Sequence, residues 1–185
     1  MKTKSNNDNK KEKRDKKWIL TVTVIAFVIS IIMSLISEIV IPSAYIGVSI
    51  FLVLVFIFIG ILFDIIGLAA QTADPKVFHS MATKKVYGSK KSIELIKNKD
   101  KVSSLFNDVV GDICGVVSGS CGLAISLNLT DMFDLNKLVT TIIVTGIISS
   151  LTIGGKAFGK TIAINNANDI IFEFSKIINV FSKNR

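Results

Sequence analysis

Four long runs of apolar residues dominate the chain, separated by polar segments. They cover residues 18–36, 46–70, 102–127 and 138–158. Each run is close to the roughly 20 residues that a helix needs to cross the hydrocarbon core of a bilayer. A soluble domain of 185 residues does not need uninterrupted apolar runs of this length. The pattern therefore predicts an all-α membrane protein with four transmembrane helices.

The longest polar segment, residues 71–101, has its own helical pattern. Pro75 near a helix start and Gly88 in the middle predict two short helices with a turn at 87–89. Residues from Asn168 onward repeat apolar positions at helical spacing, so 165–185 is predicted to be an amphipathic helix. We expect both segments to lie at the membrane surface as cytoplasmic juxtamembrane helices.

Charge gives the predicted orientation. The net charge is +8, and of 22 Lys and Arg residues eight lie in residues 1–17, eight in 71–101 and five from Lys156 onward, which leaves Lys137. The positive-inside rule then places both termini in the cytoplasm of a bacterial-type plasma membrane. Residues 1–17 are predicted to be a disordered basic tail, and 18–36 an uncleaved anchor. Basic residues beside apolar spans favour lipid headgroups over nucleic acid as the partner.

Two of the predicted spans carry acidic residues on faces that are otherwise small or polar. At 100° per residue, one stripe roughly 100° wide collects a set of polar and small residues in the third span. These are Ser104, Asp108, Gly111, Asp112, Gly115, Gly119 and Gly122. In the second span, Ser49, Gly60, Asp64, Gly67 and Gln71 share a face. Ionisable groups at membrane depth are costly, so these faces should meet a partner, a cavity or an ion.

The candidate chemistry is the binding of a hard divalent cation. Mg²⁺ prefers oxygen ligands and takes one or two carboxylates, which Asp64, Asp108 and Asp112 offer, with Ser49 on the same face as Asp64. A competing interpretation pairs Asp64 and Asp112 with Lys156 or Lys160 and leaves Asp108 hydrogen-bonded at the mouth. No thiolate or imidazole joins the carboxylates, which disfavours a soft metal.

Enzymatic activity is not expected. The sequence contains no G-x-S-x-G, H-E-x-x-H or phosphate-binding loop, and its single histidine, His79, lies in the basic segment. We therefore predict no catalytic residues.

With the spans placed, residues 46–183 resemble the transmembrane domain of the CorB/CorC/CNNM family of magnesium transport proteins. The similarity is carried in order by FDIIGLAA (63–70), MATKKVYGSKKSIELIKNKDKV (81–102), FNDVVGD (106–112) and IGGKAFGKTIAINNANDII (153–171). The resemblance implies that 46–164 is a CorC/CNNM-like transmembrane domain, to which the helix at 18–36 is an addition. The pair of cystathionine-synthase-type domains that follows it in the family is not expected on this chain.

The resemblance also implies a site. Carried over by position, Gly111, Asp112, Gly154 and Asp108 would surround the ion, with Gly111 and Gly154 supplying carbonyls where Gly154–Gly155 interrupts the last span. Three family residues are changed: an asparagine to Asp112, a glutamate to Gly155 and a proline to Gly159. The Ser-Glu at the end of the family's first span is also absent.

Two functions remain open from the sequence. The first is a protein that dimerises through its small-residue faces and binds or moves Mg²⁺ between spans two, three and four. The alternative is a non-transporting assembly or immunity-type membrane protein that kept the scaffold and lost the ion site, which the missing glutamate favours.

Overall fold

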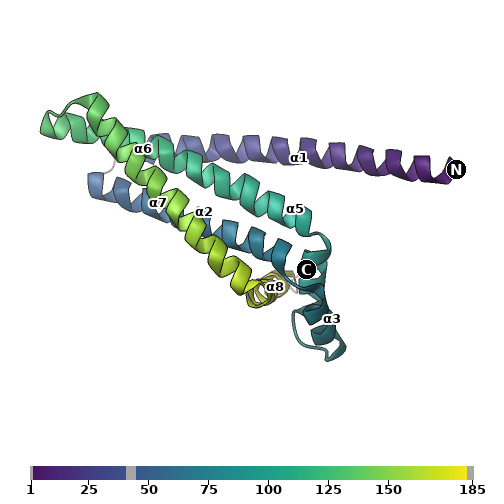
Figure 1. Cartoon of the computed structure of the whole chain (residues 1–185). Coiled ribbons are helices and arrows are strands. Elements are labelled where there is room, and N and C mark those ends of the chain that lie inside the picture. The colour runs from purple at the N-terminus through teal and green to yellow at the C-terminus, as the bar shows by residue number, and fades with distance from the viewer. Residues whose placement is uncertain (1, 41–44, 183–185) are drawn as a thin grey trace.

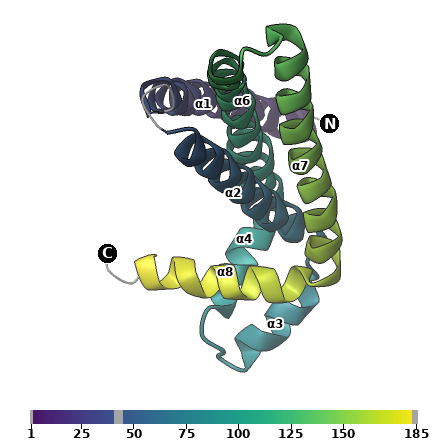
Figure 2. The same cartoon turned by 90° about the vertical axis from the view of Figure 1, so that its left-hand side faces the viewer.

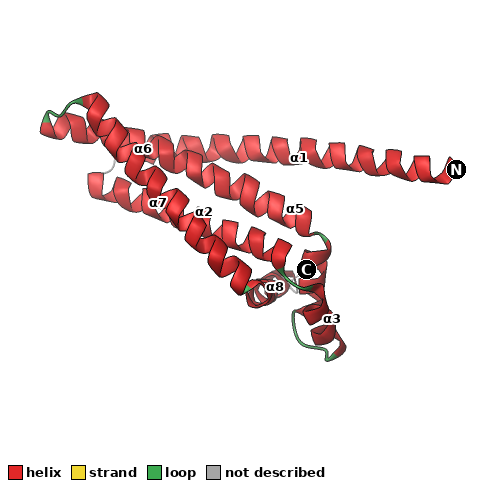
Figure 3. Cartoon of the chain, in the orientation of Figure 1, coloured by secondary structure: helices red, strands yellow, loops and turns green. Residues whose placement is uncertain are grey.

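The computed structural model describes residues 2–40 and 45–182, and within them every regular element is a helix (Figure 3). In chain order these are α1 (Lys2–Val40), α2 (Ile46–Thr72), α3 (Pro75–Thr83), α4 (Ser89–Lys97), α5 (Lys99–Ser103), η1 (Ser104–Gly111), α6 (Asp112–Phe133), α7 (Lys137–Asn165) and α8 (Ala167–Ser182). Here η1 is a π-helical segment between α5 and α6.

Four helical stretches are long and apolar enough to cross a membrane, as the hydropathy pattern predicts. They are Lys16–Leu35 within α1, Ile46–Thr72, Lys99–Phe133 and Lys137–Asn165. The third is the continuous run of α5, η1 and α6. The all-helical fold with four candidate spans is therefore confirmed.

Helix α2 lies at the centre of the bundle, against η1–α6 and α7 (Figure 2). One buried cluster joins the spans and includes Val53 and Ile57 of α2, Val117 and Cys121 of α6 and Ile148 of α7. Helix α1 is more peripheral: it packs on α6 and η1, and its apolar stretch has no buried residues. Since lipid is as apolar as these side chains, their exposure fits a membrane-facing helix.

A second buried cluster lies where α3, α4 and α8 gather at one end of the bundle (Figures 1 and 2). Phe78 of α3 and Ile171 of α8 are fully buried there against Ala69 and Ala70 of α2. We call these three short helices the platform. The N-terminal end of α1 points to the same end of the molecule (Figure 1).

The two short helices predicted in residues 71–101 are present. Pro75 is the first residue of α3, where its missing N–H costs nothing, and the Asp74 side chain accepts a hydrogen bond from the Lys76 N–H at 2.9 Å. The Asp74 N–H donates to Asn168 Oδ1 of α8 at 2.9 Å, which ties the platform together. Gly88 lies at the predicted turn with a φ of 87°, a conformation that favours glycine.

Three expectations need correction or limits. Residues 2–17 continue helix α1 instead of forming a disordered tail. Lysine, glutamate and arginine are good helix formers, and extending an existing helix is far easier than nucleating one. Helix α7 runs unbroken through Gly154 and Gly155. Pro42, between the first two apolar runs, also predicts a short turn, and this turn falls on residues 41–44, outside the described residues.

The crossing of α2 and α6 provides a stability prediction. A Cβ added at Gly60 would lie 3.0 Å from Cys114 Cβ, which is fixed to the backbone and cannot swing away. We expect Gly60→Val to lower the free energy of unfolding by about 1–3 kcal/mol. Gly146→Val on α7, where nothing lies within 4 Å, is the matched control and should have little effect. Unfolding in detergent measures both, and equal effects would contradict this packing.

Candidate functional site

The polar face of α2 points at η1 and α6. The Cβ positions of Gly60 and Gly67 would lie against residues of that helix: Gly60 against Cys114, and Gly67 within 3.2 Å of the Asn107 backbone nitrogen. Asp64 lies between these two glycines on the same face. The helices approach closely on both sides of Asp64, so its carboxylate is held between them.

The opposing surface begins in a π-helical segment. η1 covers Ser104–Gly111 and ends at the residue before Asp112. Its last residue, Gly111, is buried, and a Cβ there would lie 3.5 Å from Asp64 Oδ1. π-Helical segments inside α-helices are often found at functional sites. The segment also changes the rotation of the helix, so residues before and after it do not follow a single 100° period.

Lys156 of α7 completes the site. Its Nζ donates a hydrogen bond to Asp112 Oδ1 at 3.1 Å and lies 3.9 Å from Asp64 Oδ1. The exposed fractions of the side chains are 18% for Asp64, 27% for Lys156 and 69% for Asp112. One ammonium therefore joins carboxylates from two other helices. We call Asp64, Asp112 and Lys156 the charge cluster.

The charge cluster lies inward from the platform. Asp64 precedes Ala70, which is buried in the platform's core, by six residues, or about 9 Å of helix. Phe106 of η1 contacts Phe63 of α2 at a tilt and Phe174 of α8 edge to face, with ring centroids 5.4 Å apart in both pairs. The three rings therefore link α2, η1 and α8 in one aromatic contact.

The structure brings together some of the predicted ligands and not others. Asp64 lies against Gly111, and both Asp64 and Asp112 lie near Lys156. Asp108 is exposed on η1, one turn before Asp112. Gly154 is exposed with open space around it, and the unbroken helix at this position offers no interrupted backbone. Ser49 is fully buried, but it lies fifteen residues from Asp64 along α2, about 22 Å away.

The geometry follows the competing interpretation, in which a lysine pairs with the two aspartates. Among the side chains that the structure describes, those of residues 16–35 and 45–180, no three Asp, Glu, His or Cys residues gather closely enough to hold a metal ion. The position between Asp64 and Asp112 is taken by the Lys156 ammonium. A divalent cation would have to displace this charge or bind beside it.

Two residues matter more than the sequence indicated. Gly60 allows the close approach of α2 to α6, and Gly155 packs against Ile61 of α2. The signal for Lys156 was available, since a lysine within an apolar run needs a partner. The choice between Lys156 and Lys160 depends on the rotation of α7, which the sequence does not specify.

No protein-family model, no curated protein and no solved structure matches the chain. The resemblance to the CorB/CorC/CNNM family therefore rests on the sequence blocks quoted above, and the function it implies remains a proposal.

The charge cluster predicts a measurable coupling. Lys156→Met leaves Asp64 and Asp112 without their ammonium, and we expect a loss of about 1–3 kcal/mol in the free energy of unfolding, reduced from the buried-pair value because the side chains are partly exposed. Adding Asp64→Asn should recover part of that loss, with a coupling above about 0.5 kcal/mol in the double-mutant cycle. Unfolding in detergent measures each variant.

Lys160→Met is the matched control, because Lys160 is exposed one turn further along α7. It removes the same charge and should change stability little. Additive effects of Lys156→Met and Asp64→Asn would contradict the pairing.

Proposed function

We propose that the chain is an integral membrane protein of a bacterial-type plasma membrane, with both termini and the platform in the cytoplasm. Four helices of sufficient length and hydropathy support insertion. The platform and the N-terminal part of α1 carry most of the 22 Lys and Arg residues, whereas Asp131 and Asp134 lie at the opposite loop. This asymmetry is the one that the positive-inside rule associates with a cytoplasmic end.

Its proposed function is to bind Mg²⁺, and to move it, through a site between α2, η1–α6 and α7, as the CorB/CorC/CNNM resemblance implies. The observation that carries this proposal is the convergence of Asp64 and Asp112 on one cationic centre. These residues come from different helices, and Gly60 and Gly111 lie beside them at the close contact between α2 and η1–α6. Paired carboxylates with nearby carbonyls form a donor set suited to a hard divalent cation.

Lys156 acts in this proposal as a tethered competitor of the metal ion. Its long, flexible side chain is 27% exposed, so the ammonium has room to leave the carboxylates when a divalent cation arrives. Asp108, exposed one turn away on η1, adds negative charge on the approach. Mg²⁺ affinity is therefore expected to be low while Lys156 remains in place.

The proposed oligomer is a homodimer that uses the open part of α6. Gly115 and Gly119 have nothing within 4 Å of an added Cβ, whereas Gly111 and Gly122 are already covered within the chain. Glycines four apart on an apolar helix allow a neighbouring helix to approach closely.

One observation favours the second candidate, a non-transporting assembly or immunity-type protein. The Lys156 ammonium already pairs with the two carboxylates that a metal would need and compensates one of their two negative charges. In that case the charge cluster fixes the packing of α7 against α2 and α6, and the scaffold serves contacts with other membrane proteins.

Mg²⁺ binding by purified protein separates the two candidates. We expect Lys156→Met to raise the Mg²⁺ affinity measured by calorimetry at least about tenfold, because it removes the competing charge. Lys160→Met, the same change outside the cluster, should alter the affinity less than about threefold. Asp112→Leu should abolish Mg²⁺ binding both in the parent and in the Lys156→Met variant.

Flux in liposomes that contain the same variants completes the test. Magnesium flux that requires Asp112 supports transport. Vesicles that stay tight, together with no Mg²⁺ binding by the parent or by Lys156→Met, would contradict the magnesium proposal and leave the assembly role.

A further inference from the structure

The turn between α3 and α4 forms a groove with a basic lining. It has a volume of about 530 Å³, and its walls include Lys85, Tyr87, Lys90 and Lys91. Asn179 of α8 forms part of the opposite wall. The turn is seated on α8, since a Cβ at Gly88 would lie 3.2 Å from Lys176 Cγ. We call this feature the basic groove.

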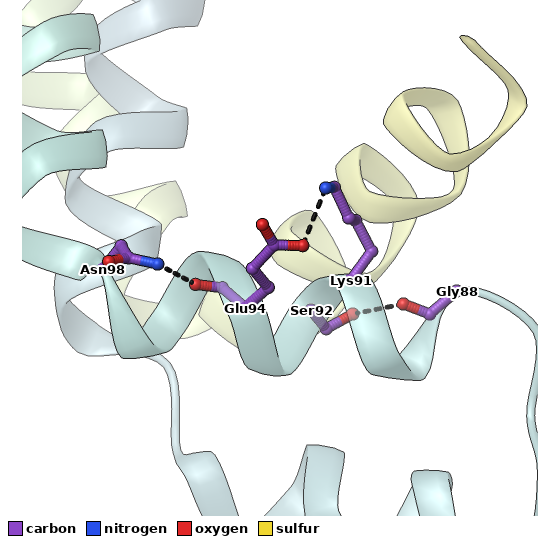
Figure 4. Close-up of polar contacts among 5 residues, drawn as sticks. All are labelled: Gly88, Lys91, Ser92, Glu94 and Asn98. Atoms are coloured by element: carbon purple, nitrogen blue, oxygen red, sulfur yellow. Dashed lines mark hydrogen bonds and ion pairs between the residues drawn. The ribbon is translucent and has the colours of Figure 1, made fainter. Parts of the chain in front are cut away.

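The basic groove holds positive charge that no described carboxylate neutralises in full. Lys91 Nζ donates to Glu94 Oε2 at 2.7 Å, on the first turns of α4 (Figure 4). Lys85 and Lys90 pair with no carboxylate in the part of the chain that the structure describes. The ammonium groups of Lys85 and Lys90 are therefore available to a ligand in the groove.

In the proposed membrane orientation, the basic groove lies beside α8, the helix that would run along the membrane surface. Helix α8 begins two residues after α7 ends and runs across the end of the bundle (Figure 2). Its outer side exposes Ile177 and Val180, at 56% and 57%. An amphipathic helix that follows a span in this way lies in the membrane interface. Tyr87, 51% exposed at the groove, is a residue type enriched at that depth.

We propose that the basic groove binds the headgroup of an anionic phospholipid from the bilayer that surrounds the protein. Lys85 and Lys90 contact the phosphate, while Lys91 is shared with Glu94. Charge complementarity and interfacial depth select this partner. The inference rests on the proposed membrane insertion and orientation, and it is independent of magnesium binding.

Native mass spectrometry of the full chain in detergent, titrated with phosphatidylglycerol, tests the proposal. We expect the triple variant Lys85→Gln, Lys90→Gln, Lys91→Gln to bind the lipid at least about tenfold more weakly than the parent. The control triple Lys76→Gln, Lys97→Gln, Lys99→Gln removes the same charge from exposed positions outside the groove. It should weaken binding less than about threefold.

Further measurements distinguish lipid binding in the groove from general attraction between the basic protein and anionic lipid. Arginine at positions 85, 90 and 91 should retain binding, and phosphatidylcholine with the same acyl chains should bind poorly to every variant. Equal weakening by both glutamine triples would overturn the proposal, as would displacement of the lipid by inorganic phosphate at similar concentration. Loss of magnesium binding in Asp112→Leu should leave lipid binding unchanged, so failure of one proposal is distinguishable from failure of the other.

Discussion

The arrangement of the spans depends on one ammonium group shared by two carboxylates. Lys156 of α7 reaches Asp112 of α6 at 3.1 Å and Asp64 of α2 at 3.9 Å. In the proposed membrane orientation, an unpaired charge among the spans is costly, so the ammonium and the carboxylates stabilise one another. Breaking such a pair on one side is more damaging than replacing both partners, because an unpaired charge remains. The charge cluster thus fixes how α7 sits against the other two helices.

Glycine makes this contact possible. Gly60 and Gly111 bring α2 and α6 together beside Asp64, and Gly155 and Gly159 bring α7 against Ile61 and Ile65 of α2. Side chains at these positions would separate the helices and move Lys156 away from the carboxylates. Gly155 itself serves close packing, because it lies directly against Ile61. The following residue, Lys156, supplies a positive charge to the same site.

The sequence predicted the elements well because hydropathy and turn chemistry are local. Long apolar runs gave the spans, Pro75 and Gly88 gave the two short helices, and the face shared by Gly60, Asp64 and Gly67 is the one that packs on η1–α6. The site was harder to predict because it depends on how each helix is rotated about its own axis. One residue along α7 turns a side chain by 100°, which separates exposed Gly154 from packed Gly155. The π-helical segment has the same effect in the third span, because it breaks the single period from which the stripe of Asp108 and the glycines was inferred.

Solid-state NMR of the full chain in lipid bilayers tests the charge cluster most directly. With ¹⁵N in lysine side chains and ¹³C in aspartate carboxyls, dipolar recoupling measures the approach of nitrogen to carboxyl carbon, and a Lys156→Met sample assigns the signal. The account predicts a coupling that corresponds to the 3.1 Å contact between Lys156 Nζ and Asp112 Oδ1 and that disappears in the variant. A spectrum of the parent that matches the spectrum of the variant would contradict it.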